Sequence, residues 1–359
     1  MDKELAYDYV IVGSGFGGSV SALRLSEKGY KVLVIEKGKW FKEAKDFPKT
    51  NWNLRKWLWM PKIGFRGLFQ MTFYRHVAVL SGVGVGGGSL VYANTLPVPN
   101  STFFNSGHWK GLCEWEEELA PFYERARHML GAATHPYMSK SDKVMKTLAE
   151  DLGDVNAFQK TEVSVYFGEP GETVDDPYFE GAGPSRTGCT LCGGCMLGCR
   201  FNAKNTLDKN YLYLAQGYGA KIQAESQVYD VLPLSEDGEA GYEVRYKNTF
   251  SYFPKKGKIR TKGIIFAAGV LGTMSLLLKL KRSSLPKLSE ALGTGIRTNS
   301  ESLVGVTTYD KKVSFSEGIA IGSIVQIDEH RHLEPVKYSA GSGFWRLFMA
   351  PMVQGKTIF

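Results

Sequence analysis

Residues 7–36 read YDYVIVGSGFGGSVSALRLSEKGYKVLVIE, and this stretch decides the fold of the domain that contains it. The apolar runs at 7–12 and 31–35 each predict a buried β-strand. Between them, 13–18 is a glycine-rich turn and 19–28 has the spacing of a helix. Strand, turn, helix and strand in this order predict the first unit of a doubly wound α/β sheet.

The turn has the G-x-G-x-x-G spacing, in which each glycine has its own task. Gly13 permits the tight turn, Gly15 lets the backbone approach a pyrophosphate, and Gly18 lets helix and strand pack closely. The helix N-terminus then offers N–H groups and a positive dipole end to the phosphates. Glu36 closes the second strand, where its carboxylate can accept ribose hydroxyls. These features predict a dinucleotide site, and the alternative is a glycine turn with a purely structural role.

Composition indicates a globular chain of two domains. The 359 residues are 43% hydrophobic and 22% charged, which excludes a disordered chain. The net charge of +8 is concentrated at 37–75, 255–262 and 279–287. We interpret this charge as a solvated basic surface, and the alternative is attraction to an anionic membrane. We expect no nucleic-acid partner, because the sequence contains no recognisable nucleic-acid-binding module.

The sequence predicts neither a leader nor a membrane span. Its first residues lead directly into a strand without a signal-peptide pattern. The longest apolar uncharged run, 263–278, is short for a span, and 77–109 is interrupted by glycines and prolines. We therefore expect a cytoplasmic protein, with peripheral membrane contact as an option.

Residues 40–76 have an unusual composition. They hold four of the 7 tryptophans, interleaved with basic residues. We favour an aromatic excursion that packs over the cofactor domain. The alternative is a lid or a membrane-touching loop that admits an apolar substrate, because Trp and basic residues together favour interfaces.

Two further segments predict backbone in close contact with a bound group. Residues 82–94 read GVGVGGGSLVYAN, and 262–273 read KGIIFAAGVLGT, a strand that turns into a leucine-rich helix. A flavin ring or its diphosphate fits such glycine-rich backbone, and a structural bulge is the alternative. Elsewhere we expect a strand at 221–231, hairpin strands at 241–246 and 258–266, and helices at 114–130 and 142–152.

These segments, in this order, resemble the glucose–methanol–choline (GMC) flavoprotein oxidoreductases, in their cholesterol-oxidase-like branch. The resemblance runs over nearly the whole chain. It is carried by GSGFGG at 13–18, GVGVGGGSLVYAN at 82–94, AKNTLDKNYL at 203–212, FAAGVLGT at 266–273 and LGTGIRTNSESLVG at 292–305.

The resemblance implies an α/β chain (α+β overall) in which a Rossmann-like, doubly wound domain binds FAD without a covalent link. A mixed-sheet substrate domain accompanies it and is incomplete in this chain. The residues implied to hold the diphosphate are Gly13, Ser14, Gly15, Phe16 and Gly18, with Glu36 on the adenosine ribose. Those implied to lie near the flavin are Gly84, Gly87, Gly88, Ser89 and Asn94. Val228 would offer backbone to the adenine, and Ala268 and Gly269 would approach the ribityl and phosphate side.

The resemblance also implies an activity: hydride transfer to flavin N5 from the CH–OH group of a bulky alcohol, with a sterol as one option. The family's catalytic His, with a second His or Asn, lies near a more distant C-terminus, and none of the 6 histidines here has that context. We therefore expect the N-terminal part of a longer enzyme and assign no catalytic residue. His330 and His332 are expected in a solvent-facing turn. The alternative is a non-catalytic flavin- or cluster-binding fragment, or an electron-transfer subunit.

Four of the 5 cysteines form a C-x2-C-x2-C-x3-C run: Cys189, Cys192, Cys195 and Cys199. Its spacing favours an iron–sulfur cluster, 3Fe–4S or 4Fe–4S. A zinc site and a group of redox-active or structural thiols stay open. A cluster would pass electrons from FAD to an acceptor protein.

The expected domain organisation is discontinuous. The FAD-binding domain takes residues 1–100 and 186–300, with the cysteine loop at 189–199. The substrate or cap domain takes 101–185 and 301–359.

Overall fold

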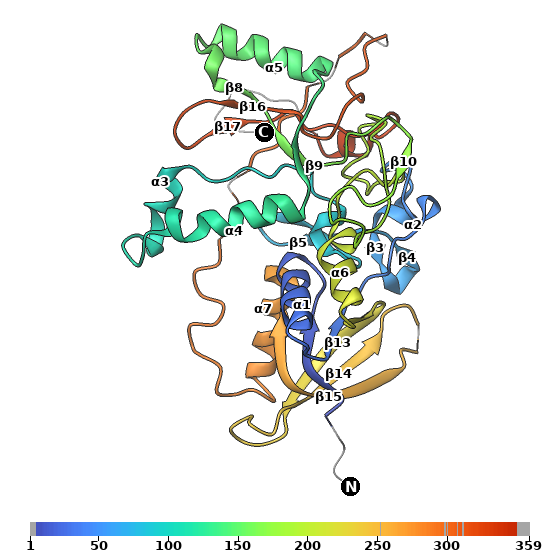
Figure 1. Cartoon of the computed structure of the whole chain (residues 1–359), viewed down its shortest axis with the longest axis vertical. Coiled ribbons are helices and arrows are strands. Elements are labelled where there is room, and N and C mark those ends of the chain that lie inside the picture. Colours follow the sequence, from blue (N-terminus) through green and yellow to red (C-terminus); the bar gives the residue numbers. More distant parts are fainter. Residues whose placement is uncertain are drawn as a thin grey trace.

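The computed structural model describes residues 5–349, apart from 252, 298, 300, 307 and 311. Figure 1 shows two regions along the long axis of the molecule: one around a large sheet near the N-terminus, and one of smaller sheets and the helices α4 and α5. The region 292–305, which carries part of the family resemblance, therefore lies partly outside the described residues.

The large sheet has six strands in the order β12-β2-β1-β15-β14-β13. The first four pair in parallel, whereas β14 and β13 extend the sheet as an antiparallel meander. Their bounds are β1 Tyr7–Val12, β2 Val32–Ile35, β12 Lys221–Gln223, β13 Ser226–Pro233, β14 Tyr242–Asn248 and β15 Lys256–Phe266.

Helices cover both faces of this sheet, which explains why β1 and β2 are apolar at every position from Val10 to Val12 and from Val32 to Ile35. Side chains alternate between faces along a strand. Ile11 and Val34 pack with helices α1 (Phe16–Glu27) and α6 (Tyr211–Gly217). Val10 and Leu33 pack on the other face, with α7 (Gly269–Lys281). The doubly wound α/β fold is confirmed.

Local expectations for this region hold with two differences. The first helix begins at Phe16, one turn before the expected position, because Gly15 already acts as its N-cap. The expected strand at 221–231 is wrong as a single element: it is divided into β12 and β13, which lie at opposite edges of the sheet. Glu225, at φ 53°, turns the chain between them. The expected hairpin is confirmed by the antiparallel pairing of β14 with β15.

The second region consists of short elements. Its helices are α2 (Leu54–Trp57), α3 (Ser101–Phe104), α4 (Trp115–Met129) and α5 (Lys140–Asp151), so both expected helices are confirmed. Its small sheets pair β3 (Trp59–Met60) with β4 (Phe65–Arg66), β5 (Phe69–Phe73) with β6 (Ala78–Gly82), β7 (Ala132–Thr134) with β9 (Glu162–Ser164), β10 (Thr173–Val174) with β11 (Arg186–Thr187), and β16 (Ser323–Gln326) with β8 (Phe158–Lys160) and β17 (His332–Leu333).

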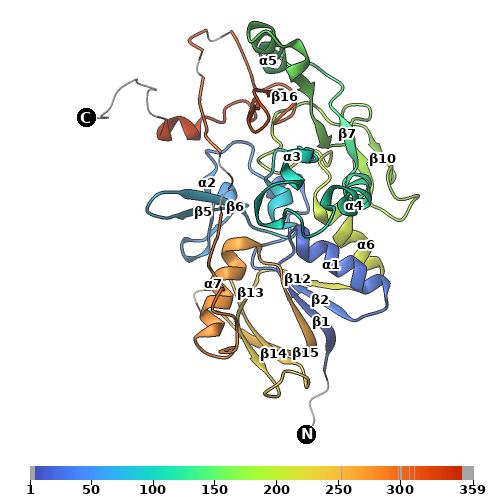
Figure 2. The ribbon, with the colours of Figure 1, turned by 90° about the vertical axis from the view of Figure 1, so that its left-hand side faces the viewer.

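The aromatic stretch at 40–76 divides into a buried part and an exposed tip. Phe41, Trp57 and Phe69 join Phe344 in one buried cluster, so these side chains have a packing role. The hairpin β5–β6 projects from the body of the molecule in Figure 2. Phe73, at its end, is 68% exposed. The lid or membrane-contact alternative for this tip stays a prediction.

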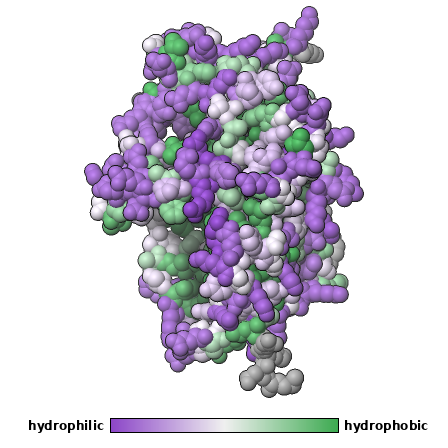
Figure 3. Space-filling view, viewed as in Figure 1, coloured by the Kyte–Doolittle hydropathy of each residue, from purple (hydrophilic) through white to green (hydrophobic). Residues whose placement is uncertain are grey.

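The surface seen in Figure 3 is largely hydrophilic, with apolar residues in scattered groups. Within the part of the chain that the structure describes, no helix has both the length and the apolar composition to cross a bilayer.

A buried histidine in the second region predicts acid sensitivity. Burial lowers the pKa of His135 to about 4; Asp142 opposes this shift, while Lys337 and Lys160 add to it. Above pH 6.5 the folded and unfolded chains both hold a neutral imidazole. Between pH 6.5 and 4 only the unfolded chain gains the proton, so the free energy of unfolding should fall by about 3 kcal/mol.

Denaturant unfolding measured at several pH values checks this expectation. His135→Phe should flatten the dependence between pH 6.5 and 4, because the ring stacks on Phe167 and phenylalanine has no proton to gain. The matched control is the exposed His330, whose replacement by Gln should leave the slope unchanged. A slope that persists in His135→Phe would contradict the assignment.

Candidate dinucleotide site and cysteine hollow

In the first glycine turn, backbone atoms crowd Gly13 and Gly18, whereas the space beside Gly15 is open. This difference agrees with the roles that the sequence predicts for them. A Cβ at Gly13, at φ 101°, would lie 2.5 Å from the Ala267 oxygen, and a Cβ at Gly18 would lie 2.0 Å from the Gly13 oxygen. Both positions must be glycine because backbone occupies the space. A Cβ at Gly15 would meet nothing within 4 Å. The space beside Gly15 is open, as a pyrophosphate would need.

Glu36 is buried at the end of β2, with 6% of its surface exposed. Its carboxylate accepts hydrogen bonds from the Ser14 N–H (3.1 Å), the Ser14 hydroxyl (2.8 Å) and the Gly38 N–H (2.9 Å). A carboxylate offers about four acceptor positions, so it can still accept a ribose hydroxyl. The three donors fix its orientation before any ligand binds.

The second glycine run packs directly against the first. A Cβ at Gly87 would lie 2.7 Å from the Gly15 Cα. The Gly86 N–H donates to the Ser14 hydroxyl at 3.1 Å, so Ser14 joins Glu36 to this run. Ser89 donates to the Gly86 oxygen and accepts from the Leu207 N–H at 3.0 Å. The structure therefore brings Ser14, Gly15, Gly87 and Glu36 together.

The third predicted segment ends at the same edge of the sheet. Val12 and Phe266 are paired residues at the ends of the parallel strands β1 and β15. Ala268 then caps α7, its N–H donating to the Thr273 hydroxyl at 3.0 Å, and a Cβ at Gly269 would meet nothing within 4 Å. Neither α1 nor α7 has an acidic residue in its first turn, so both positive helix ends suit an anion.

The other residues predicted to bind the cofactor differ in burial and in their neighbours. Phe16 is exposed and packs edge-on to Tyr92, near Gly88. Val228 is a buried side chain of β13, just before an irregularity in its pairing with β14. Asn94 is fully buried at φ 74°, and neither atom of its amide has a hydrogen-bond partner among the described residues. Gly84 also has a positive φ, and it packs against Leu90 and Phe41.

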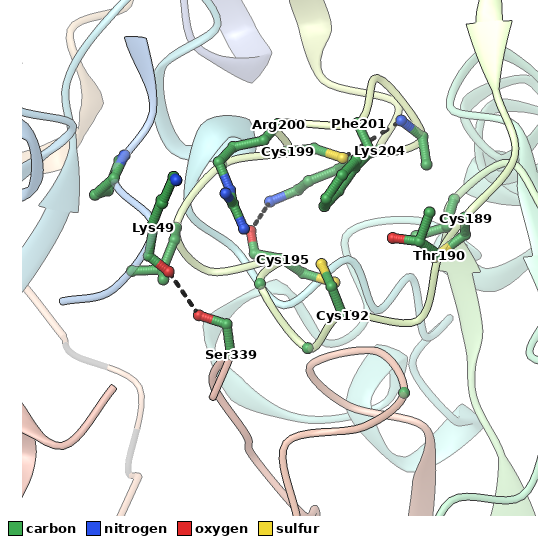
Figure 4. A pocket seen from close by; sticks show the side chains of 18 residues that line it. Lys49, Cys189, Thr190, Cys192, Cys195, Cys199, Arg200, Phe201, Lys204 and Ser339 are labelled. Carbon is green, nitrogen blue, oxygen red and sulfur yellow. Dashed lines mark hydrogen bonds between the residues drawn. The ribbon is translucent and has the colours of Figure 1, made fainter. Parts of the chain in front are cut away.

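The four cysteines of the run line one small hollow, shown in Figure 4. All four are reduced and partly buried. Burial raises the pKa of the Cys189 thiol to about 12, and it also raises the pKa of the Cys195 thiol, a shift that the charge of Lys204 opposes. These thiols are therefore protonated at neutral pH in the protein as it stands.

A buried lysine adjoins the hollow. Lys204 is 1% exposed and its Nζ donates to the carbonyl oxygens of Tyr92 (2.7 Å), Cys195 (3.0 Å) and Leu90 (3.2 Å). Burial lowers its pKa to about 7. Sequence reasoning missed this residue, although it lies within AKNTLDKNYL, because a lysine beside asparagine and threonine reads as a surface residue.

The structure does not form a site for a single metal ion at these cysteines. Across the described residues, no group of three or more His, Cys, Asp or Glu side chains converges as one bound ion requires. Neither the iron–sulfur interpretation of the run nor the zinc alternative therefore receives support from the geometry.

His330 and His332 do not lie in a setting that suits a catalytic residue. The side chains of His330 and His332 are 72% and 48% exposed, each near a glutamate, so the expected solvent-facing position is confirmed.

Comparisons with known proteins agree with this geometry. A family model described as "NAD(P)-binding Rossmann-like domain" matches residues 11–40. The chain is 47% identical to a cholesterol oxidase of Acinetobacter baumannii, over 98% of this chain and 64% of that protein. It is 44% identical to a cholesterol oxidase of Mycobacterium tuberculosis, over 97% of this chain and 61% of that protein.

More distant matches are also found. A long-chain-alcohol oxidase of Arabidopsis thaliana is 26% identical over 76% of this chain and 34% of that protein. A solved fungal aryl-alcohol oxidase gives a TM-score of 0.44 at 15% identity, covering 76% of this chain and 47% of that one.

The glycine turns that meet at one edge of a doubly wound sheet, together with these relatives, support the resemblance to the GMC oxidoreductases. Within that family the chain is similar to the cholesterol oxidases. The chain spans about three fifths of the length of these two curated cholesterol oxidases, at 64% and 61%.

Proposed function

We propose that this chain provides the FAD-binding part of an oxidoreductase that oxidises the CH–OH group of a bulky alcohol, with sterols among its substrates. The observation that carries the proposal is the meeting of Ser14, Gly15 and Gly87 beside the buried Glu36. The names of the relatives, cholesterol oxidase and long-chain-alcohol oxidase, support the substrate class.

The residues present fit FAD. The open space at Gly15 and Gly269 suits a diphosphate, and Glu36 suits the adenosine ribose. Asn94, with its unpartnered buried amide, suits a polar group that the protein itself does not supply. Gly84, Gly88 and Ser89 would face the flavin side with it, and Val228 the adenine.

In this proposal, the chain's own residues bind the cofactor and orient it. When bound, FAD would supply the acceptor for the substrate's hydride. Ser14 holds the Glu36 carboxylate and the Gly86 N–H in one network, so binding at the ribose and at the second glycine run is coupled. The proton acceptor for the alcohol stays unassigned.

We also propose a domain organisation, partners and a location for the protein. The domains would be 1–100 with 186–300 for FAD, and 101–185 with 301–359 for substrate. An electron-acceptor protein and peripheral membrane contact through the β5–β6 tip are further proposed partners. A cytoplasmic location follows as an expectation of the same kind.

Anaerobic addition of cholesterol, or of a long-chain primary alcohol, to the FAD-loaded protein tests the proposed function. Bleaching of the flavin absorbance with either alcohol is the expected result, and peroxide formation on admitting air would favour an oxidase over a dehydrogenase. FAD that binds but is never bleached by any alcohol would instead favour a non-catalytic flavin-binding fragment or an electron-transfer subunit.

A further inference from the structure

A buried lysine joins the second glycine run to the cysteine loop. The ammonium of Lys204 donates to the main-chain oxygens of Leu90 and Tyr92, in the glycine run, and to that of Cys195, in the loop, as Figure 4 shows for the last of these bonds. An ammonium has three N–H donors, so the three carbonyl groups satisfy all of them. One side chain therefore fixes two backbone segments that are about a hundred residues apart, at separations of 114, 112 and 9 residues from the lysine.

The two oxygens of the glycine run depend on this lysine. Among the described residues, Lys204 is the only hydrogen-bond donor to the Leu90 and Tyr92 oxygens. A carbonyl group that loses its donor inside the protein keeps its full cost of desolvation. Without the ammonium, residues 90–92 would have to shift toward another donor. Asn94, two residues further on, would shift with them.

The lysine itself projects from a fixed base. The main chain is held on both sides of Lys204: the Tyr166 N–H donates to the Ala203 oxygen, and the Asn205 N–H donates to the Ser164 oxygen, both at 2.9 Å. The side chain is 1% exposed. Because its base cannot easily move, the ammonium can hold the carbonyl groups in place rather than follow them.

The same side chain also supports the first glycine turn, through an aromatic pair. The Lys204 Nζ lies 4.6 Å from the centre of the Tyr92 ring, and this ring packs edge-on against Phe16, with 5.8 Å between the two centroids. A cation is attracted to the face of an aromatic ring. Phe16 directly follows Gly15 and begins α1. Lys204 is therefore connected to both segments that we expect to bind FAD.

For stability alone, an apolar side chain would be less costly at this position. A buried ammonium loses its hydration, and a well-packed apolar side chain avoids that loss. What Lys204 supplies instead is a set of three directed hydrogen bonds to main chain. Bonds of this kind fix the positions of backbone atoms, as a preorganised binding site requires.

We propose that Lys204 is a positioning residue of the flavin site, which holds the Leu90 and Tyr92 carbonyl groups against the cysteine loop so that the second glycine run keeps the shape that FAD needs. This role rests on the proposed function, because the glycine run has such a task only if FAD binds there. The Cys195 oxygen gives the cysteine loop a part in the same site, as the support on the other side of the ammonium.

Lys204→Met tests this role, because methionine has a similar length and lacks the three donors. The FAD affinity of the apoprotein, measured by fluorescence titration, should fall at least about tenfold. Hydrogen exchange of the apoprotein should become faster at residues 88–94, whereas β1 and α1 should keep their wild-type protection. At saturating FAD, the absorption maxima of the bound flavin should differ from those of the wild type, since the backbone beside it has moved.

Lys337→Met is the matched control for the loss of a buried lysine. Lys337 is 6% exposed and donates to the Ser139 hydroxyl and to the Glu317 oxygen, so it does not contact the glycine run. Both variants should lower the thermal stability of the apoprotein, but only Lys204→Met should lower FAD affinity and change the flavin absorption. A loss of affinity in Lys204→Met no larger than in Lys337→Met, or flavin maxima identical to those of the wild type, would overturn the role of Lys204.

A second variant keeps the test decisive if Lys204→Met does not fold. Lys204→Gln retains two N–H donors on a shorter side chain, so its FAD affinity should still fall below that of the wild type, and an unchanged affinity would overturn the proposed role. Wild-type protein that binds no FAD would overturn the proposed function together with this role. Wild-type protein that binds FAD beside unaffected Lys204 variants would overturn the role of Lys204 alone.

Discussion

Replacing Glu36 by alanine should weaken FAD binding by about 1.5–3 kcal/mol, a loss of roughly 10- to 150-fold in affinity. The carboxylate is buried, and three donors from Ser14 and Gly38 orient it before the ligand arrives. Its removal deletes the ribose acceptor and frees the Ser14 hydroxyl that also accepts from Gly86. Fluorescence titration of apoprotein with FAD measures the change.

Glu27→Ala is the matched control, because Glu27 is exposed on α1 and forms an ion pair with Arg24 on the same helix. Its FAD affinity should equal that of the wild type. Thermal unfolding of both apoproteins separates loss of fold from loss of binding. If Glu36→Ala titrates like the wild type, the carboxylate does not contact the cofactor and the assignment of the first motif fails.

Gly15→Ala should lower FAD affinity at least about tenfold while leaving the fold intact. Gly15 has φ −70° and ψ −166°, which alanine adopts without strain, and its added methyl group would meet no protein atom within 4 Å. The methyl group would instead occupy the space into which the pyrophosphate must come. Stability should change by less than about 1 kcal/mol.

Gly217→Ala provides the comparison, since Gly217 is a helical, exposed residue whose added methyl group also meets nothing within 4 Å. FAD affinity should be unchanged in that variant. Equal affinities in Gly15→Ala and Gly217→Ala would show that the diphosphate binds elsewhere.

The features that could be predicted from the sequence depend mainly on residues that are close together in the chain. Strand, turn and helix at 7–36 are local, and Gly18 is constrained within the turn by Gly13, whereas the close contact at Gly13 comes from the distant Ala267. The division of 221–231 into β12 and β13 could not be predicted, because both halves have strand composition and only their distant partners place them at opposite edges.

In the candidate site, too, the features that depend on residues distant in sequence could not be predicted. Glu36 could be placed by its distance from the glycine turn, but the part that Ser14 plays depends on Gly86, 72 residues away. The cysteine run was visible from its spacing. The burial of Lys204 and Arg186 beside it was not, because nothing in their local sequence distinguishes them from surface residues.

The nucleotide that the protein binds distinguishes a flavin oxidoreductase from a nicotinamide-binding protein. The purified protein, or its apoprotein after titration with FAD and with NAD, is examined by absorption spectroscopy and by analysis of the released nucleotide. We predict flavin bands and stoichiometric FAD, with no tight binding of NAD. A colourless protein that binds NAD tightly and rejects FAD would contradict the account.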